Sequence, residues 1–163
     1  MGIQIPGELA GLLNELGYMW PESDEERLFE LAQAWIAFGA EADAVAVDAT
    51  GAVAGLLAAN EGAALEAFHG QWTDGDSAPT VLQELGFGAR AVGAALLVCA
   101  MVVLALKINV IVQLTLLAIS IAQAIATAAP TLGASLLEIP VFKKLVDIAI
   151  DFLIGQALEA VLG

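Results

Sequence analysis

Apolar residues recur at steps of three and four along most of the chain, the spacing that places side chains on one face of a helix. The first group of this kind lies between Pro6 and Gly17 and consists of Leu9, Leu12, Leu13 and Leu16. Proline suits the first turn of a helix, and glycine suits the position just after its end. The pattern therefore predicts a short helix over residues 6–16.

A long helix is expected to follow. Ser23 and Glu26 have the spacing of a capping box, which indicates a helix start at Ser23. The alanine-rich pattern then continues without proline to Trp72. One face of this helix would hold Leu28, Leu31, Ala32, Trp35, Phe38, Ala42, Val45 and Ala46. Three of the glycines inside the pattern, Gly51, Gly55 and Gly62, could bend or interrupt it. Each destabilises a helix interior by about 1 kcal/mol relative to alanine, so they are candidate breaks.

A second long helix completes the predicted architecture. The segment TDGDSAP, residues 73–79, has the composition of a turn, and Thr80 can cap a helix that continues to about Ala129. Pro130 and Gly133 would end it. We therefore expect an all-α protein built as an elongated antiparallel helical hairpin. Residues 1–135 would form the hairpin domain, and residues 136–163 a C-terminal amphipathic helix that packs on it or leads to a following domain.

Charge and hydropathy are distributed unevenly between the halves of the chain. Residues 1–84 contain 15 acidic residues and one basic residue, whereas residues 85–163 contain four of each. The acidic half is incompatible with nucleic-acid binding, which depends on Lys and Arg to neutralise phosphates. The overall hydrophobic content of 60% is above that of ordinary soluble domains and points toward the membrane class.

The stretch from Ala91 to Ala129 contains a single charge, Lys107. Its polar residues form one narrow stripe, made of Asn109, Gln113, Ser120, Gln123 and Thr127. A helix that is apolar on its other sides is either central in a helical bundle or in contact with lipid. We prefer burial against the alanine-rich first helix, the C-terminal helix or a second copy. The alternative is a pore or membrane-translocating domain that uses residues 91–129, with the stripe lining a lumen.

Catalytic and metal-binding patterns are missing from the sequence. His69 is the only histidine and Cys99 the only cysteine, so neither a multi-histidine metal site nor a disulfide can be built. Asp74 and Asp76 lack the remaining spaced ligands of a calcium loop. We therefore expect a non-enzymatic protein without catalytic residues, metal or cofactor.

Three segments carry a resemblance to a known family: PGELAGLLNELGYMWPESDEERLFELAQAW, EAFHGQWTDGD and LALKINVIVQLTLLAISIAQAIATAAPTLGAS. Together they resemble the N-terminal domain of actinobacterial polymorphic toxins. That family is similar to Trp-X-Gly (WXG) substrates of type VII secretion and includes the N-terminal domain of a mycobacterial outer-membrane channel toxin. The resemblance implies an export-targeting module that precedes a toxin domain. Its expected partners are the secretion machinery or a small Trp-X-Gly helical protein, with self-association as a further expectation.

The resemblance also implies roles for particular residues. Trp20 and Pro21 would open the long helix, and Phe68, Trp72 and Gly75 would form the hairpin turn, with Asp74 beside them. The chain departs from the strict motif, because Trp72 and Gly75 are separated by two residues. Tyr18 and Glu22 have the spacing of a type VII export signal, although such signals follow the hairpin in the resembling substrates.

The resemblance implies secretion, and the expected route does not use a cleaved signal peptide, because the N-terminus lacks a basic region followed by a continuous apolar core. Membrane association is the expectation under the pore alternative. A third alternative is a structural helical protein that only pairs with another hairpin.

Overall fold

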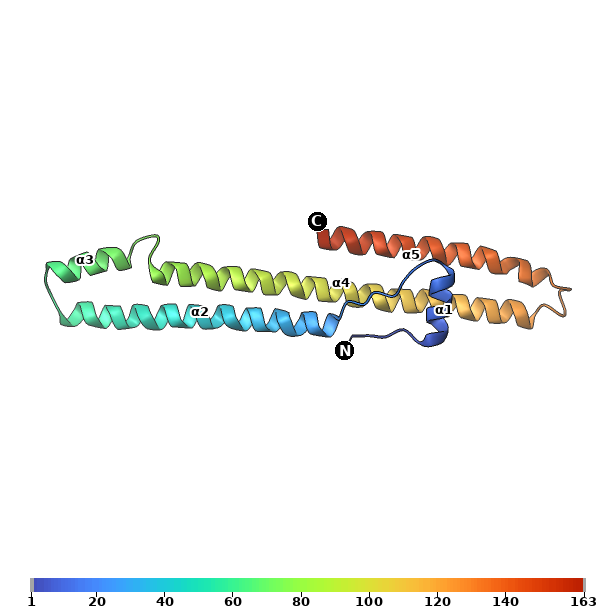
Figure 1. Ribbon diagram of the computed structural model, residues 1–163, viewed down its shortest axis with the longest axis horizontal. Coiled ribbons are helices and arrows are strands. Elements are labelled where there is room, and N and C mark those ends of the chain that lie inside the picture. Colours follow the sequence, from blue (N-terminus) through green and yellow to red (C-terminus); the bar gives the residue numbers. More distant parts are fainter. Residues whose placement is uncertain (1, 163) are drawn as a thin grey trace. The chain divides into compact units, whose positions relative to one another are not determined.

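The computed structural model describes residues 2–162, and their regular secondary structure is helical throughout (Figure 1). The elements are α1 (Gly7–Glu15), α2 (Glu25–Ala59), α3 (Ala63–Trp72), α4 (Ala78–Ala126), the 3-10 helix η1 (Ala134–Glu138) and α5 (Ile139–Leu162). The predicted all-α class and helical hairpin are confirmed. Residues Leu28–Leu97 form one compact unit, and the segments on either side of it form the other.

In the unit of residues 28–97, the chain reverses direction at residues 60–62. Figure 1 shows α3 running antiparallel to α2 and in the same direction as α4. Gly62 has φ +129°, a conformation that residues with a side chain rarely adopt. The hairpin turn was expected after Trp72, but the chain reverses at Gly62, which was one of the candidate breaks. Gly51 and Gly55 lie inside α2 and do not break it.

The helix starts also differ from those expected. α2 begins at Glu25 rather than Ser23, because the Asp24 side chain accepts a hydrogen bond from the backbone N–H of Arg27 at 3.1 Å. α4 begins at Ala78, and the backbone carbonyl of Ser77 accepts the Val81 N–H. The shift of two residues in each case reflects competition between neighbouring capping residues, which spacing alone does not resolve.

Small residues form the contact between α2 and the first part of α4. The buried positions on α2 include Ala32, Gly39 and Ala46, spaced by seven, and those on α4 include Gly86 and Gly93. A Cβ atom on Gly39 would lie 2.7 Å from the carbonyl oxygen of Gly86, so only glycine permits this approach. Seven-residue spacing keeps one seam of each helix facing its partner.

This seam corrects the face assigned from the sequence. The large residues of that face point away from the seam and remain at least 40% exposed, namely Leu31, Trp35, Phe38 and Val45. Helical spacing places these residues near the alanines, but close approach of the two backbones leaves no room for them between the helices.

The other unit contains α1, the second part of α4, η1 and α5. Its core is made of Leu13, Val110, Leu114, Leu117, Val146 and Ile150. Side chains of the N-terminal segment, including Tyr18 and Trp20, pack against this core. Figure 1 shows α5 alongside the second part of α4, in the opposite direction. α5 begins close to the expected residue. The expected domain boundary at residues 135/136 falls within η1 and stays a prediction.

Candidate interaction surfaces

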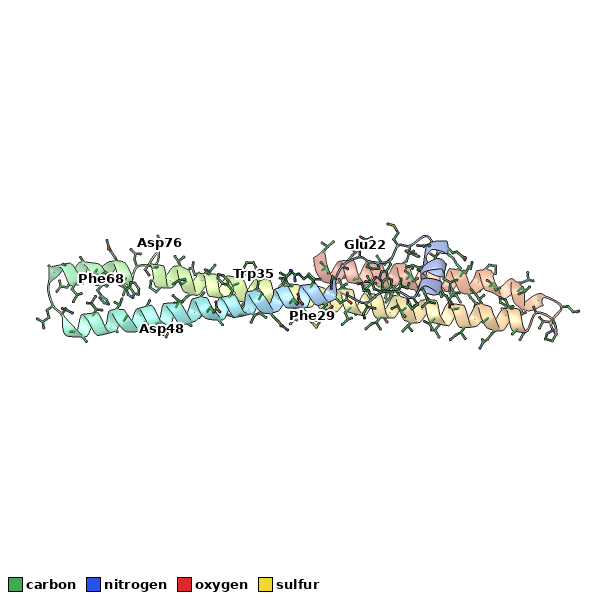
Figure 2. The ribbon with its side chains drawn as sticks, turned by 60° about the horizontal axis from the view of Figure 1, so that its bottom comes forward. Glu22, Phe29, Trp35, Asp48, Phe68 and Asp76 are labelled. Carbon is green, nitrogen blue, oxygen red and sulfur yellow. The ribbon has the colours of Figure 1, made fainter. Side chains whose placement is uncertain are left out.

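The first candidate surface is the loop between α3 and α4. Phe68 and Trp72 lie one turn apart on α3, with ring centroids 5.9 Å apart and both side chains half-buried. Asp74 and Gly75 follow in the exposed loop, and Figure 2 shows Phe68 and Asp76 at this end of the unit. The structure thus brings the predicted aromatic pair together next to exposed loop residues. The loop joins two helices that run in the same direction, so it is not the hairpin turn.

The second candidate surface is the junction that precedes α2. Trp20 and Pro21 are half-buried, and Glu22 is exposed (Figure 2). The ammonium group of Lys107 lies 5.8 Å from the Trp20 ring centroid, a cation–π distance. The indole N–H of Trp20 is buried and has no hydrogen-bond partner among the described residues. Trp20 therefore acts as a packing residue that covers a charge, while Glu22 faces outward.

Tyr18, the first residue of the candidate export signal, is tied to α5. Its hydroxyl lies 2.7 Å from Oδ1 of Asp151 and 2.9 Å from Oδ1 of Asp147. Burial and the hydrogen bonds to Asp151 and Asp147 raise the pKa of Tyr18 above its usual range. The hydroxyl carries one proton, so it donates to one carboxylate at a time. Tyr18 thus has a structural attachment that Glu22 does not share.

A buried ion pair between Lys107 and Glu25 lies where the N-terminal segment meets α4. The sequence pattern did not identify Glu25 as the partner of Lys107. Lys107 is 1% exposed, and its Nζ donates to Oε2 of Glu25 at 2.8 Å and to the Ser23 carbonyl at 2.6 Å. Burial would raise the pKa of Glu25, but the hydrogen bonds from Lys107 and from the Ile3 N–H outweigh it and lower that pKa to about 2. A lone lysine in an apolar stretch was the available signal that an acidic partner exists.

The polar stripe of α4 is largely satisfied by its own helix. The side chains of Asn109, Ser120 and Thr127 each donate to the carbonyl four residues earlier, at 2.8, 2.8 and 2.9 Å. Gln113 is half-buried and Gln123 is exposed. Three of the five stripe residues therefore hydrogen-bond to the backbone of their own helix and need no water or ligand as a partner. A role for the stripe in a lumen or interface stays a prediction.

An exposed aromatic surface on α2 was not anticipated from the sequence. It consists of Leu31, Ala34, Trp35 and Phe38, called the α2 aromatic surface below, and it forms a shallow, almost wholly apolar depression. The Trp35 and Phe38 rings meet edge to face with centroids 6.1 Å apart. Both are exposed, at 40% and 44%. Figure 2 shows Trp35 on α2. Exposed aromatic residues of this kind are enriched at protein interfaces.

Among the helices of residues 2–162, two are long and apolar enough to cross a membrane by length and composition. They are α2 and α4, whose most apolar 18-residue windows have mean hydropathies of 1.5 and 2.6. Only 11% and 17% of those windows are buried within the protein. A core helix of a soluble protein passes the same length and composition test, but such a helix would be mostly buried. Much apolar surface of α2 and α4 is therefore left without a protein partner in this chain.

Within residues 2–162, no cluster of three or more His, Cys, Asp or Glu side chains is arranged to hold a metal ion.

Comparison with known proteins gives one match. The family described as the WXG100 like domain matches residues 4–142, from the N-terminal segment into α5. No curated protein and no solved structure matches the chain. Proteins of this family are helical, generally non-enzymatic and associated with type VII secretion, and they typically pair with other WXG proteins or the secretion machinery. Because the match covers most of the sequence, the chain belongs to the WXG100-like family and is a type VII secretion-associated helical protein.

Proposed function

We propose that this chain is the N-terminal export-targeting and interaction module of a polymorphic toxin secreted by a type VII-like system. The observation that carries the proposal is the family match over residues 4–142. The apolar surface that α2 and α4 leave uncovered supports it, since a module that works by binding needs such a surface.

The proposed docking surface for the secretion machinery is the loop after Trp72. Asp74 and Gly75 are exposed there, and the Phe68–Trp72 pair fixes the end of α3 from which the loop departs. Trp20 and Pro21 would act indirectly, by positioning the start of α2.

The proposed partner-binding surface is the α2 aromatic surface. Leu31, Trp35 and Phe38 are spaced by four and three, so they lie on one side of α2. This spacing suits an apolar helix of a small Trp-X-Gly partner laid along α2.

Export of a Trp72→Ala variant tests the targeting role. We expect export from a host with the secretion system to be lost while the thermal midpoint stays within a few degrees of wild type. Phe87→Ser is the matched control, because Phe87 is 72% exposed on α4 and lies outside the loop. Normal export of the Trp72→Ala variant would overturn the docking role, and a large fall in thermal midpoint would mean that Trp72 is a packing residue.

The Tyr18–Glu22 export signal is kept as a narrower proposal. Glu22→Gln changes the candidate signal but leaves the hydrogen bonds of the Tyr18 hydroxyl to α5 intact. An effect of this variant on export would therefore not come from loss of those bonds. Reduced export of Glu22→Gln with unchanged folding is the expected result, and unchanged export would remove the signal.

A pore-forming or membrane-translocating domain is the second candidate function. It is favoured by the mean hydropathy of 2.6 in the most apolar window of α4, of which only 17% is buried. Gln113→Leu should then change single-channel conductance in a planar bilayer without changing insertion. Equal conductance of variant and wild type would exclude the stripe as a lumen lining.

A further inference from the structure

The turn between α4 and α5 exposes leucine side chains to an unusual degree. Leu132 is 97% exposed and Leu137 is 77% exposed, and Leu136 beside them is also exposed. Figure 1 shows this turn at one end of the hairpin formed by α4 and α5. Scattered exposed leucines are ordinary in soluble proteins, but several on one turn form an apolar patch that requires a partner.

The turn holds Leu132 outward in a fixed conformation. Leu132 has φ +53°, a left-handed conformation that is unfavourable for a residue with a side chain. The backbone around it is well bonded, since the Gly133 N–H donates to the Ala128 carbonyl at 2.7 Å and the Ser135 hydroxyl to the Ala124 carbonyl at 2.7 Å. Strain at an exposed leucine, held by surrounding bonds, is typical of a functional position.

The apolar surface continues onto both helices that flank the turn. Ile125 on α4 and Val141 and Leu145 on α5 are exposed. Val141 is five residues before Val146, which places the two on nearly opposite sides of α5. The exposed apolar residues thus continue from the turn onto the end of α4 and onto the side of α5 that faces away from the core.

Charge is absent from this tip. Residues 108–137 contain no acidic or basic side chain, and the nearest charges on the C-terminal side are Glu138, Lys143 and Lys144. Lys143 pairs with Glu15 at 2.6 Å and Lys144 with Asp147 at 2.5 Å. An uncharged turn bordered by the exposed Glu138 and by the ion-paired Lys143 and Lys144 complements a hydrocarbon layer bordered by polar headgroups.

We propose that residues 127–137 form a membrane-contact site that inserts its leucines into the hydrocarbon region of a phospholipid bilayer. A bilayer suits this turn because residues 108–137 offer no charged side chain with which a protein partner could pair. The zero net charge of residues 85–163 lets this half approach the headgroups without repulsion. The inference does not rest on the export role, which concerns other residues.

Flotation with phosphatidylcholine vesicles tests this site. Wild-type protein should float with the vesicles, and the double variant Leu132→Asn with Leu137→Ser should partition at least about tenfold less. Asn tolerates the left-handed conformation at position 132, and both side chains are exposed, so the variant is expected to fold. Phe87→Ser changes an apolar side chain that is 72% exposed in the other unit, and this variant should float like wild type.

A fluorescent label gives an independent readout. Cys99 is the only cysteine, so Cys99→Ser combined with Ala129→Cys allows an environment-sensitive dye to be placed beside the tip. Its emission should shift to shorter wavelength when vesicles are added, while a dye at Asp76→Cys should not respond.

Wild-type protein that stays at the bottom of the gradient would overturn the proposal, and so would equal flotation of the wild type and the double variant. A dye at position 129 whose emission does not change when vesicles are added would also overturn it. An oligomer that forms without lipid and is lost in the double variant, together with no flotation, would assign the tip to self-association instead.

Discussion

At the scale of single residues, the buried Lys107–Glu25 pair is the feature with the largest expected energetic consequence. Lys107 lies in the most apolar stretch of the chain and satisfies its charge with Glu25, the Ser23 carbonyl and the Trp20 ring. A buried charge without a partner is strongly unfavourable, whereas a complete pair is tolerated. The pair therefore fixes the N-terminal segment at one position along α4.

Lys107→Met removes one partner of this pair. It should lower the free energy of unfolding by about 3–5 kcal/mol, because Glu25 is left buried and charged. Urea denaturation measures the change, and the double variant with Glu25→Gln should recover part of it. No recovery in the double variant would show that packing of the lysine chain, rather than the charge, is responsible.

Acid should weaken the pair in a defined pH range. Glu25 has a pKa of about 2 in the folded chain, below its ordinary value of 4.5, so its contribution is present above about pH 4.5 and is lost as pH falls toward 2. The free energy of unfolding of wild type minus that of Glu25→Gln should decrease by about 3 kcal/mol between pH 5 and pH 2. A difference that is constant across this range would contradict the lowered pKa.

At the scale of elements, the contact between α2 and α4 depends on where glycine lies. Gly39 faces the backbone of Gly86, whereas a Cβ atom on Gly51 would have no neighbour within 4 Å. The two positions are on the same helix, so helix propensity affects both equally and only the contact differs. They form a matched pair for substitution by alanine.

Gly39→Ala should destabilise the hairpin by about 1–3 kcal/mol, because the added methyl group forces the helices apart. Gly51→Ala should stabilise it by about 0.5–1 kcal/mol, because alanine restricts the unfolded chain and suits a helix interior. Thermal denaturation followed by circular dichroism compares the two. Equal effects of the same sign would show that the close contact does not exist in solution.

At the scale of the whole molecule, many large apolar residues are exposed. They occur on α2, α4 and α5, while the net charge of −14 favours solubility. Acidic residues keep the chain dispersed, and the apolar surfaces provide for assembly with partners. The two properties together suit a secreted module that meets its partner after synthesis.

Trp35→Ser with Phe38→Ser should reduce self-association of detergent-free protein without unfolding it, because both rings are exposed on α2. Size-exclusion chromatography with light scattering should show a lower mass than wild type at the same concentration. Loss of helical circular dichroism in the variant would mean that the rings belong to a core. A wild-type monomer at every concentration would contradict the prediction.

The family and the helical class could be predicted from the sequence because they depend on local patterns. Helical spacing, capping residues and the segments around Trp20 and Trp72 are read directly along the chain. The start of α5 and the end of α4 near Pro130 were also close to expectation. The site roles of Trp72, Tyr18 and the polar stripe stay predictions, since no contact in the described residues assigns them.

The sequence by itself determined that the chain is helical and where its charged and apolar residues concentrate. It also showed that Lys107 is the single charged residue between Ala91 and Ala129. Only the tertiary structure decided that the reversal lies at Gly62, that glycine and alanine form the seam, and that Glu25 neutralises Lys107. The physical reason is that spacing fixes which side chains share a helix face. Which face is buried depends on how closely two backbones approach, and that is a property of residues far apart in the chain.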